Sequence, residues 1–160
     1  MQTYTNLSVS ANIGYAYLAK SDFLQYLCRK TLSDMATHNE LGIWGEEYAA
    51  SYLRSKGYTI EERDWRFGHR DIDIIARTPD NATLVFVEVK TRTNDEVTKP
   101  EDAIDIKKIR NIGMAANSYV KQRNVDDNLR FDIITIIGNC DDNAQLHHCK
   151  DAFNPCLAYR

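Results

Sequence analysis

Four charged residues, arranged as two pairs on neighbouring predicted strands, could carry out hydrolysis. Asp71 and Asp73 are two positions apart, as are Glu88 and Lys90, so each pair shares one face of its strand. If residues 79–82 form the turn, Asp73 lies opposite Glu88 and Asp71 lies opposite Lys90. Directly opposed Cβ atoms are about 4.5–5.5 Å apart. We therefore expect these groups to converge on one face of a hairpin, and a register shifted by one residue would separate them.

The chemistry expected of such a cluster depends on a cation. The opposite face of the hairpin is predicted to be apolar, with Ile72, Ile74, Val87 and Val89. Two close carboxylates repel each other unless one is protonated or a cation lies between them. Oxygen ligands suit Mg²⁺ or Mn²⁺, and metal-activated water beside a lysine can hydrolyse a phosphodiester. The spacing alone also allows an ion-pair ladder between Asp71 and Lys90 on a solvated face.

The segments around this hairpin predict one α/β sheet with helices packed against it, in the order α-β-β-β-α-β-β. A helix is expected from Asn39, a suitable N-cap, to Gly57, a suitable stop. A second helix is expected to begin at Pro100. Strands are predicted over residues 58–66, 70–77, 83–92, 129–137 and 145–153.

Composition limits the functional classes. The 160 residues are 43% apolar and 27% charged, which indicates one globular domain and no membrane-spanning helix or membrane partner. The net charge of −3 means that nucleic-acid binding would need a local basic patch. The four cysteines form no CxxC pair, so reduced thiols and a cytoplasmic location are expected. A zinc site from residues 147–149 and Cys156 is disfavoured, because adjacent histidines on a strand point to opposite faces.

The chain is expected to contain an N-terminal extension over residues 1–39, a single domain over residues 40–153 and a tail over residues 154–160. Two interpretations of the extension stay open. Met35 could be the natural start, which would place the preceding residues outside the functional core. Alternatively, the segment forms an ordinary amphipathic helix packed on the domain.

Asp73 with Glu88-x-Lys90, on a hairpin after a helix and a strand, resembles the PD-(D/E)xK nuclease site of restriction-endonuclease-like folds. An ordered series of motifs resembles the YraN-like family of small bacterial proteins more closely. The matching segments are residues 42–46, 57–58, 71–77 and 86–92, then Lys108, Ala116, Tyr119 and residues 130–132. Such an ordered series is more specific than any single motif. The resemblance implies a three-layer fold with a central mixed β-sheet and flanking helices, similar to archaeal Holliday-junction resolvases.

The resemblance also implies roles for individual residues. Asp73 and Glu88 would bind Mg²⁺ or Mn²⁺, and Lys90 would lie beside the attacking water. Glu46 would be the additional acidic residue of resolvase-type sites, and Lys108 would face substrate phosphate. From the sequence alone, Glu46 could instead be a first-turn acid favoured by the helix dipole, and Lys108 could belong to a solvated helix face.

The function that the resemblance implies is a magnesium-dependent endonuclease acting on DNA, including branched or structured DNA, with RNA left open. A phosphate-contacting rim could be formed by Arg63, Arg66, His69, Arg70 and Arg92. The sequence departs from the family at Asp71, where glutamate is usual, and at residues 69–70, where glycine is usual. The alternative is a non-catalytic nucleic-acid-binding or scaffolding module. Resolvase-like enzymes act as dimers, which leaves a homodimer open.

Overall fold

The computed structural model describes residues 38–93 and 104–159. The chain forms two compact units, Met1–Glu40 and Leu41–Arg160, and the second contains all the strands described below. Most of the predicted extension over residues 1–39 and the predicted helix start at Pro100 lie outside the described residues. Among the described residues, no helix is both long enough and apolar enough to cross a membrane.

The first described helix covers residues 38–55. Because Asn39 is already helical, the prediction that it caps the helix is wrong. The predicted stop at Gly57 is confirmed: this glycine has φ 82°, a conformation that costs other residues more. The next residue, Tyr58, donates its N–H to the carbonyl of Leu53 over 3.0 Å, which satisfies one of the last carbonyls of the helix.

The second helix, α2, spans Ile106–Arg123. It begins at Asp105, whose side chain accepts the N–H of Lys108 over 2.7 Å, a standard N-cap bond. The backbone of Asp105 is extended (φ −84°, ψ 160°). A continuous helix from Pro100 is therefore excluded, and the predicted start of this helix is wrong.

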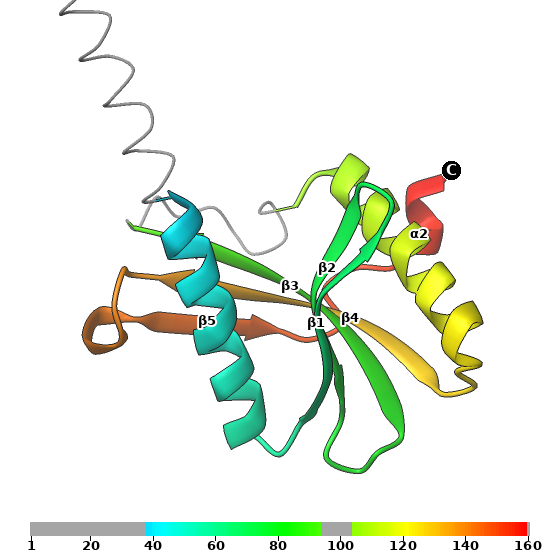
Figure 1. Cartoon of the computed structure of the whole chain (residues 1–160), viewed down its shortest axis with the longest axis horizontal. Helices are drawn as coiled ribbons and strands as arrows, with labels where there is room; N and C mark the ends of the chain where they lie inside the picture. The colour runs from blue at the N-terminus through cyan, green and yellow to red at the C-terminus, as the bar shows by residue number, and fades with distance from the viewer. Residues whose placement is uncertain (1–37, 94–103, 160) are drawn as a thin grey trace, which may run out of the picture. The chain divides into compact units, whose positions relative to one another are not determined.

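Five strands form one mixed sheet in the order β1-β2-β3-β4-β5 (Figure 1). The β3–β4 pair is parallel and the other three pairs are antiparallel. The strands are β1 (Thr59–Phe67), β2 (Arg70–Arg77), β3 (Thr83–Arg92), β4 (Asn128–Ile137) and β5 (Gln145–Cys149). The predicted element order is confirmed. The last strand is shorter than predicted, because the chain turns at residues 150–151 and Asp151 has φ 52°.

The register of the β2–β3 hairpin is the one predicted. Pairing runs from Arg77 with Leu84 to Ile74 with Val87, and the turn is the predicted segment 79–82. Beyond Ile74 and Val87 the two strands no longer pair, although β2 continues to pair with β1. We call this divergence of β2 and β3 the fork. Figure 1 shows the β1–β2 hairpin bending away from β3.

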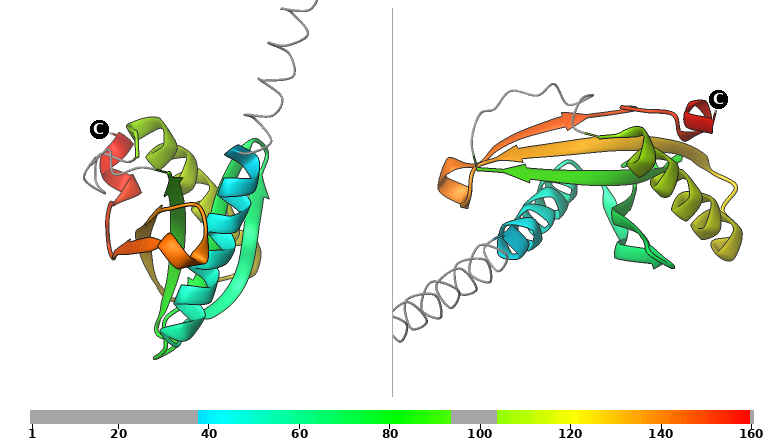
Figure 2. Two further views of the ribbon diagram at one scale, coloured as in Figure 1. Left: turned by 90° about the vertical axis from the view of Figure 1, so that its left-hand side faces the viewer. Right: turned by 90° about the horizontal axis from the view of Figure 1, so that it is seen from above.

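The helices cover opposite faces of the sheet and make three layers (Figure 2). Ala49 and Leu53 of the first helix belong to one core cluster, with Ile74, Ala76, Val85, Val87 and Val89. Residues of α2 belong to the other cluster, with Ile75, Leu84 and Phe86. Ile72 lies in the α2 cluster, so the prediction that it shares a face with Ile74 is wrong; the strand changes orientation at the fork. The α/β arrangement is the one expected of a restriction-endonuclease-like fold.

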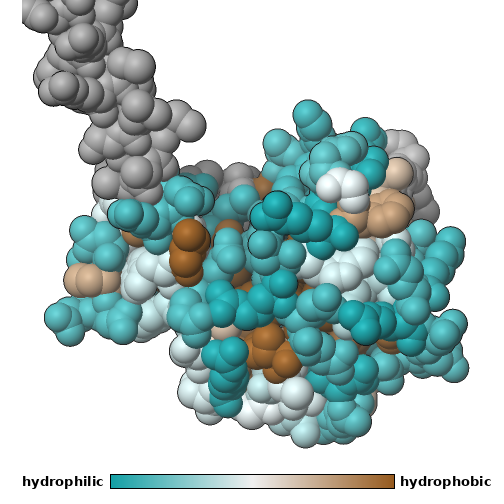
Figure 3. Space-filling view, in the orientation of Figure 1, coloured by the Kyte–Doolittle hydropathy of each residue, from teal (hydrophilic) through white to brown (hydrophobic). Residues whose placement is uncertain are grey.

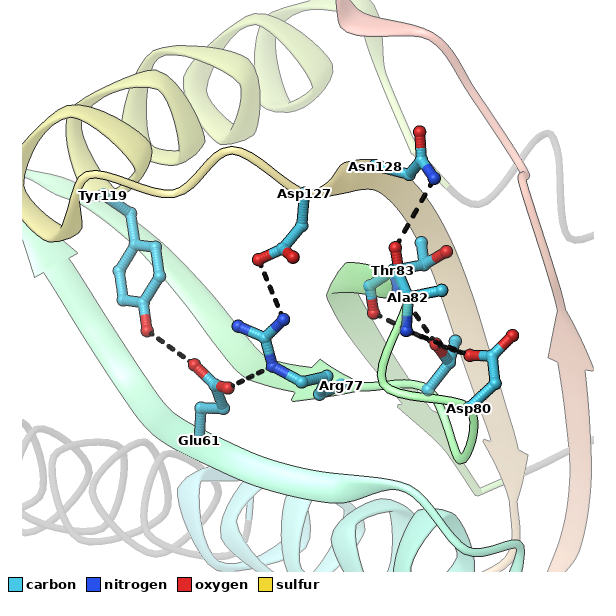
Figure 4. A network of polar contacts seen from close by, with 9 residues as sticks. Glu61, Arg77, Asp80, Ala82, Thr83, Tyr119, Asp127 and Asn128 are labelled. Atoms are coloured by element: carbon cyan, nitrogen blue, oxygen red, sulfur yellow. Dashed lines mark hydrogen bonds and ion pairs between the residues drawn. The ribbon is translucent and has the colours of Figure 1, made fainter.

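Two buried or half-buried polar networks fasten the sheet. In Figure 4, Arg77 donates to Glu61 over 2.6 Å and to Asp127 over 2.8 Å, and Glu61 also accepts from Tyr119. This network joins β1, β2 and α2 to the segment that enters β4. A second network surrounds Asp132, which is fully buried and accepts from Arg130 and from the N–H of Asp151, with His148 Nε2 at 2.8 Å. Figure 4 also shows the polar contacts that order the β2–β3 turn.

Candidate functional site

Asp73 occupies the first position of β2 beyond the fork. Its Oδ2 accepts a hydrogen bond from the backbone N–H of Val89 over 2.7 Å. The side chain thereby takes the place of a backbone acceptor, which a buried N–H requires. This bond ends the β2–β3 ladder and fixes the carboxylate of Asp73 next to β3, at the position of Glu88 and Val89.

Glu88 is a buried carboxylate held by two lysines. Its side chain is 2% exposed, and Oε1 lies 2.7 Å from Nζ of Lys90. Nζ of Lys108 lies 3.2 Å from Oε2 of Glu88 and donates to Oδ1 of Asp71 over 3.1 Å. Oε2 has no hydrogen bond among the described residues, although it is ion-paired. The alternative ladder between Asp71 and Lys90 is therefore not the arrangement found, since each residue has another partner.

The charges at the fork change the protonation of the acids. Burial, followed by the charge of Glu88, raises the pKa of Asp73 to about 8, against the lowering effects of the Val89 N–H and Lys108. Burial also raises the pKa of Glu46, and the charges of Asp64, Asp71 and Glu88 act in the same direction. The acids therefore repel one another strongly enough to favour a shared proton or an added cation.

Lys108 balances part of this negative charge. Burial alone lowers its pKa, but Glu88, Asp73 and the contacts with Asp71 outweigh that effect and raise the pKa overall. The sequence-based interpretation of Lys108 as a solvated residue is wrong, because its ammonium group joins two carboxylates. Its predicted role toward phosphate stays a prediction.

Glu46 reaches the site from the first helix because that helix approaches β3 closely. A Cβ on Gly45 would overlap the hydroxyl of Thr91, so only glycine permits this packing. Glu46 lies more than two turns after residue 38, which rules out a first-turn position. Sequence reasoning missed Gly45, whose signal is a glycine inside a predicted helix, where it usually reflects close packing.

The predicted rim residues are only partly brought together. Arg66, Gly68, His69, Arg70 and Asp71 line a pocket of about 270 Å³. Arg66 is paired with Asp64 at 3.0 Å, whereas Nε of Arg70 is buried without a hydrogen-bond partner in the described chain. Arg92 ends β3, two residues after Lys90, and lies outside the lining of this pocket.

A larger groove, of about 420 Å³, runs beside the first helix and contains Trp44, Tyr48 and Tyr52. None of the carboxylates at the fork lines it. The candidate site is placed at the fork and not in this groove. At the fork, the buried carboxylate of Glu88 lies near two lysines and near acids whose pKa values are raised by its charge. Perturbed and coupled ionisable groups are typical of functional sites.

The carboxylate pair fits a hard divalent cation. Mg²⁺ commonly takes one or two protein carboxylates and fills its other positions with water and phosphate oxygens. Asp73 and Glu88 supply such a pair, and Oε2 of Glu88 is a buried acceptor without a hydrogen bond in the described chain. Over residues 38–93 and 104–159, no group of three His, Cys, Asp or Glu side chains is placed to hold a metal. A site here would therefore depend on water and substrate for its remaining ligands.

The orientations of the two adjacent histidines argue against zinc at β5. His147 is exposed, whereas His148 turns inward to Asp132, as expected for neighbours on a strand. Among the described residues, Cys140 and Cys156 are exposed free thiols.

The chain matches the model of the Uncharacterised protein family UPF0102 over residues 45–136. The chain belongs to this family. Among its relatives is a UPF0102 protein of Bacteroides thetaiotaomicron, 47% identical over 123 residues that cover 77% of this chain and 99% of the relative. A UPF0102 protein of Phocaeicola vulgatus is 44% identical over 121 residues (76% and 98%), and one of Porphyromonas gingivalis is 42% identical over 127 residues (79% and 92%). The predicted resemblance to the YraN-like family is thus confirmed.

Replacing Gly45 by alanine should force the first helix away from β3. We expect Gly45→Ala to lower the free energy of unfolding by about 1–3 kcal/mol, the usual cost of overpacking, measured by urea denaturation. Gly42→Ala is the matched control on the same helix, because its Cβ would meet no atom within 4 Å. The control should be stabilising by about 0.5–1 kcal/mol. Equal effects of the two substitutions would contradict the close contact.

The raised pKa of Asp73 should make the metal-free protein less stable at higher pH. Its protonated form is favoured in the folded state, so this contribution is complete below about pH 4 and is lost as the pH rises to about 8. Urea denaturation in EDTA should show the free energy of unfolding falling between pH 5 and pH 8. Asp73→Asn should remove this fall and gain about 1 kcal/mol or more at pH 8. Asp142→Asn, at an exposed position, should leave the fall intact; parallel profiles for all three proteins would refute the assignment.

Proposed function

We propose that this UPF0102 protein is a magnesium-dependent endonuclease that hydrolyses phosphodiester bonds in DNA. The observation that carries the proposal is the buried carboxylate of Glu88 at the fork. Its charge raises the pKa of Asp73, and it is ion-paired with Lys90 and Lys108. A carboxylate that is 2% exposed is costly unless its charge is compensated. A divalent cation bound between this carboxylate and the second acid would compensate the charge of both.

The chain's own groups divide the work of hydrolysis. Asp73 and Glu88 would hold Mg²⁺ or Mn²⁺. A bound ion of this kind lowers the pKa of a water ligand and neutralises charge on the phosphate. Lys90, 33% exposed and fixed by Glu88, would orient the attacking water through Nζ.

Lys108 and Glu46 complete the arrangement. Lys108 joins Glu88 and Asp71, and in the proposed reaction its ammonium group would contact the phosphate. The carboxyl of Glu46, with its raised pKa, would accept or return a proton at the edge of the site. Groups with raised pKa values suit this role near neutral pH.

DNA is the proposed substrate because basic side chains gather next to the carboxylates at the fork. Arg70 and His69 line the pocket that also includes Asp71, and Asp71 is bound to Lys108. This connection places possible phosphate contacts next to the carboxylates, despite the net charge of −3. The free thiols of Cys140 and Cys156 agree with action in the reducing cytoplasm. A homodimer on symmetric DNA is part of the same proposal.

Cleavage should require Glu88. We expect purified protein with Mg²⁺ to cut duplex, flap or four-way-junction DNA, and Glu88→Gln to slow cutting by about 100-fold or more, the effect of losing one preorganised charged group. Glu47→Gln is the matched control, because Glu47 is 57% exposed on the first helix. Equal cleavage by all three proteins would assign the activity to a contaminant. Binding that survives EDTA and Glu88→Gln without any product would instead indicate the non-catalytic nucleic-acid-binding module.

Magnesium should also stabilise the fold directly, independently of any DNA. A ligand that binds only the folded state at 100 times its Kd adds about 2.7 kcal/mol, and relief of the repulsion between Asp73 and Glu88 acts in the same direction. The melting temperature should therefore rise with Mg²⁺ at constant ionic strength, and this rise should be absent in Glu88→Gln. A melting temperature that stays constant over a wide Mg²⁺ range would argue against a metal site at the fork.

A further inference from the structure

A partly apolar groove lies at the tip of the β1–β2 hairpin. In the view of Figure 3 the surface is mainly hydrophilic, with apolar residues in small separate areas. Phe67, the last residue of β1, and Met114 of α2 are both 42% exposed. They line one groove of about 390 Å³, so two exposed apolar side chains from different elements meet in a single concave surface. Concave surfaces of this size are typical of ligand sites.

The ring of Phe67 lies parallel to a ring that belongs to the core. It stacks on Trp65, with ring centroids 6.5 Å apart and planes at 10°. Trp65 is only 9% exposed and meets Tyr119 of α2 edge-on, at 5.4 Å and 86°. Phe67 is therefore the outer member of an aromatic series anchored in the core. An exposed aromatic ring suits a flat aromatic ligand such as a nucleobase, because every base has a face that can stack.

The remaining lining of the groove is polar and carries positive charge. Asn117, Ser118 and Gln122 present amide and hydroxyl groups, and Lys121 adds an ammonium group. None of the described residues that line the groove is acidic. The combination of an aromatic ring, hydrogen-bonding groups and one cation matches a base with its phosphate better than it matches an apolar protein segment.

The groove is connected to the candidate site. Arg66, which precedes Phe67, lines the pocket of about 270 Å³ at the hairpin tip together with Asp71. Asp71 in turn binds Lys108. Along α2, the groove residues Met114 to Gln122 follow Lys108 by 6 to 14 positions, a rise of about 9–21 Å along the helix axis.

We propose that this groove stacks an unpaired base of the substrate on Phe67, next to the site at the fork. The preferred substrate is then DNA with a single-stranded or branched segment, because bases within a duplex are already paired and stacked and would have to be extruded. The inference rests on the proposed function, and it names the substrate class that the same site selects.

Binding in EDTA tests the inference separately from cleavage. Fluorescence anisotropy would compare a fully paired duplex, the same duplex with a single-stranded flap, and that flap with abasic positions in place of its first five bases. The native protein should bind the flap about 10-fold more tightly than the other two, as one stacked base is worth about 1–3 kcal/mol. With 2-aminopurine as the unpaired base, binding should quench its fluorescence.

Substitutions at Phe67 distinguish stacking from general apolar contact. Phe67→Ala and Phe67→Leu should abolish the preference for the flap and leave duplex affinity unchanged, whereas Phe67→Trp should retain it. Leu129→Ala is the matched control, because Leu129 is 44% exposed and is the second residue of β4, where it pairs with Leu84. The control should bind every DNA like the native protein.

Several outcomes would overturn the inference. If Phe67→Leu keeps the preference, or if the abasic flap binds as well as the intact flap, no base is stacked on the ring. If Phe67→Ala converts a dimer to a monomer in light scattering, the groove is an interface between two copies of the chain. Duplex cleavage without any flap preference would overturn the inference alone, whereas absence of binding to every DNA would overturn the proposed function as well.

Discussion

The hydrogen bond from the N–H of Val89 to the carboxylate of Asp73 determines how the rest of the site is built. It ends the pairing of β2 with β3 and still holds the two strands together at the point where they separate. Without this bond, the N–H at the fork would be left without an acceptor inside the sheet, at a cost of about 1–3 kcal/mol. One side chain thus opens the sheet and brings an acid next to Glu88. Both helices then approach the opened region, one carrying Glu46 and the other Lys108.

The electrostatics of the fork follow from this geometry. A sheet interior normally excludes charge, yet Glu88 is buried there with an ammonium group near each of its oxygens. These lysines make the metal-free fold tolerable, because unpaired buried charges are strongly destabilising. Lys108 belongs to a different layer from Lys90, so the two ammonium groups reach Glu88 from different elements. The burial of Glu88 therefore depends on positive charge supplied by both Lys90 and Lys108.

Much of the fold could be predicted, because two strand-like segments flank the turn at residues 79–82 and the four-residue turn sets their register. That register also predicted Asp73 opposite Glu88, but the pairing ends at Ile74 and Val87, so Asp73 approaches β3 through its bond to the N–H of Val89 instead. The sequence could not reveal the fork, since it depends on the side chain of Asp73 replacing a backbone group, and Ile72 consequently faces the other core. The contacts of Lys108 were also hidden, because they depend on the helix beginning at Asp105. Tertiary contacts of this kind leave no periodic signal.

The outer strands of the sheet have a consequence for how the protein meets other molecules. β1, at one edge in the described chain, has a bulge between Ile60 and Glu62 and a left-handed residue at Asp64 (φ 49°). It also carries charges at five of its nine positions, and β5, at the other edge, has only five residues. Short, bulged and charged borders discourage a foreign strand from joining the sheet. Self-association into extended sheets is thereby opposed, and recognition is directed to the helices and the hairpin tip.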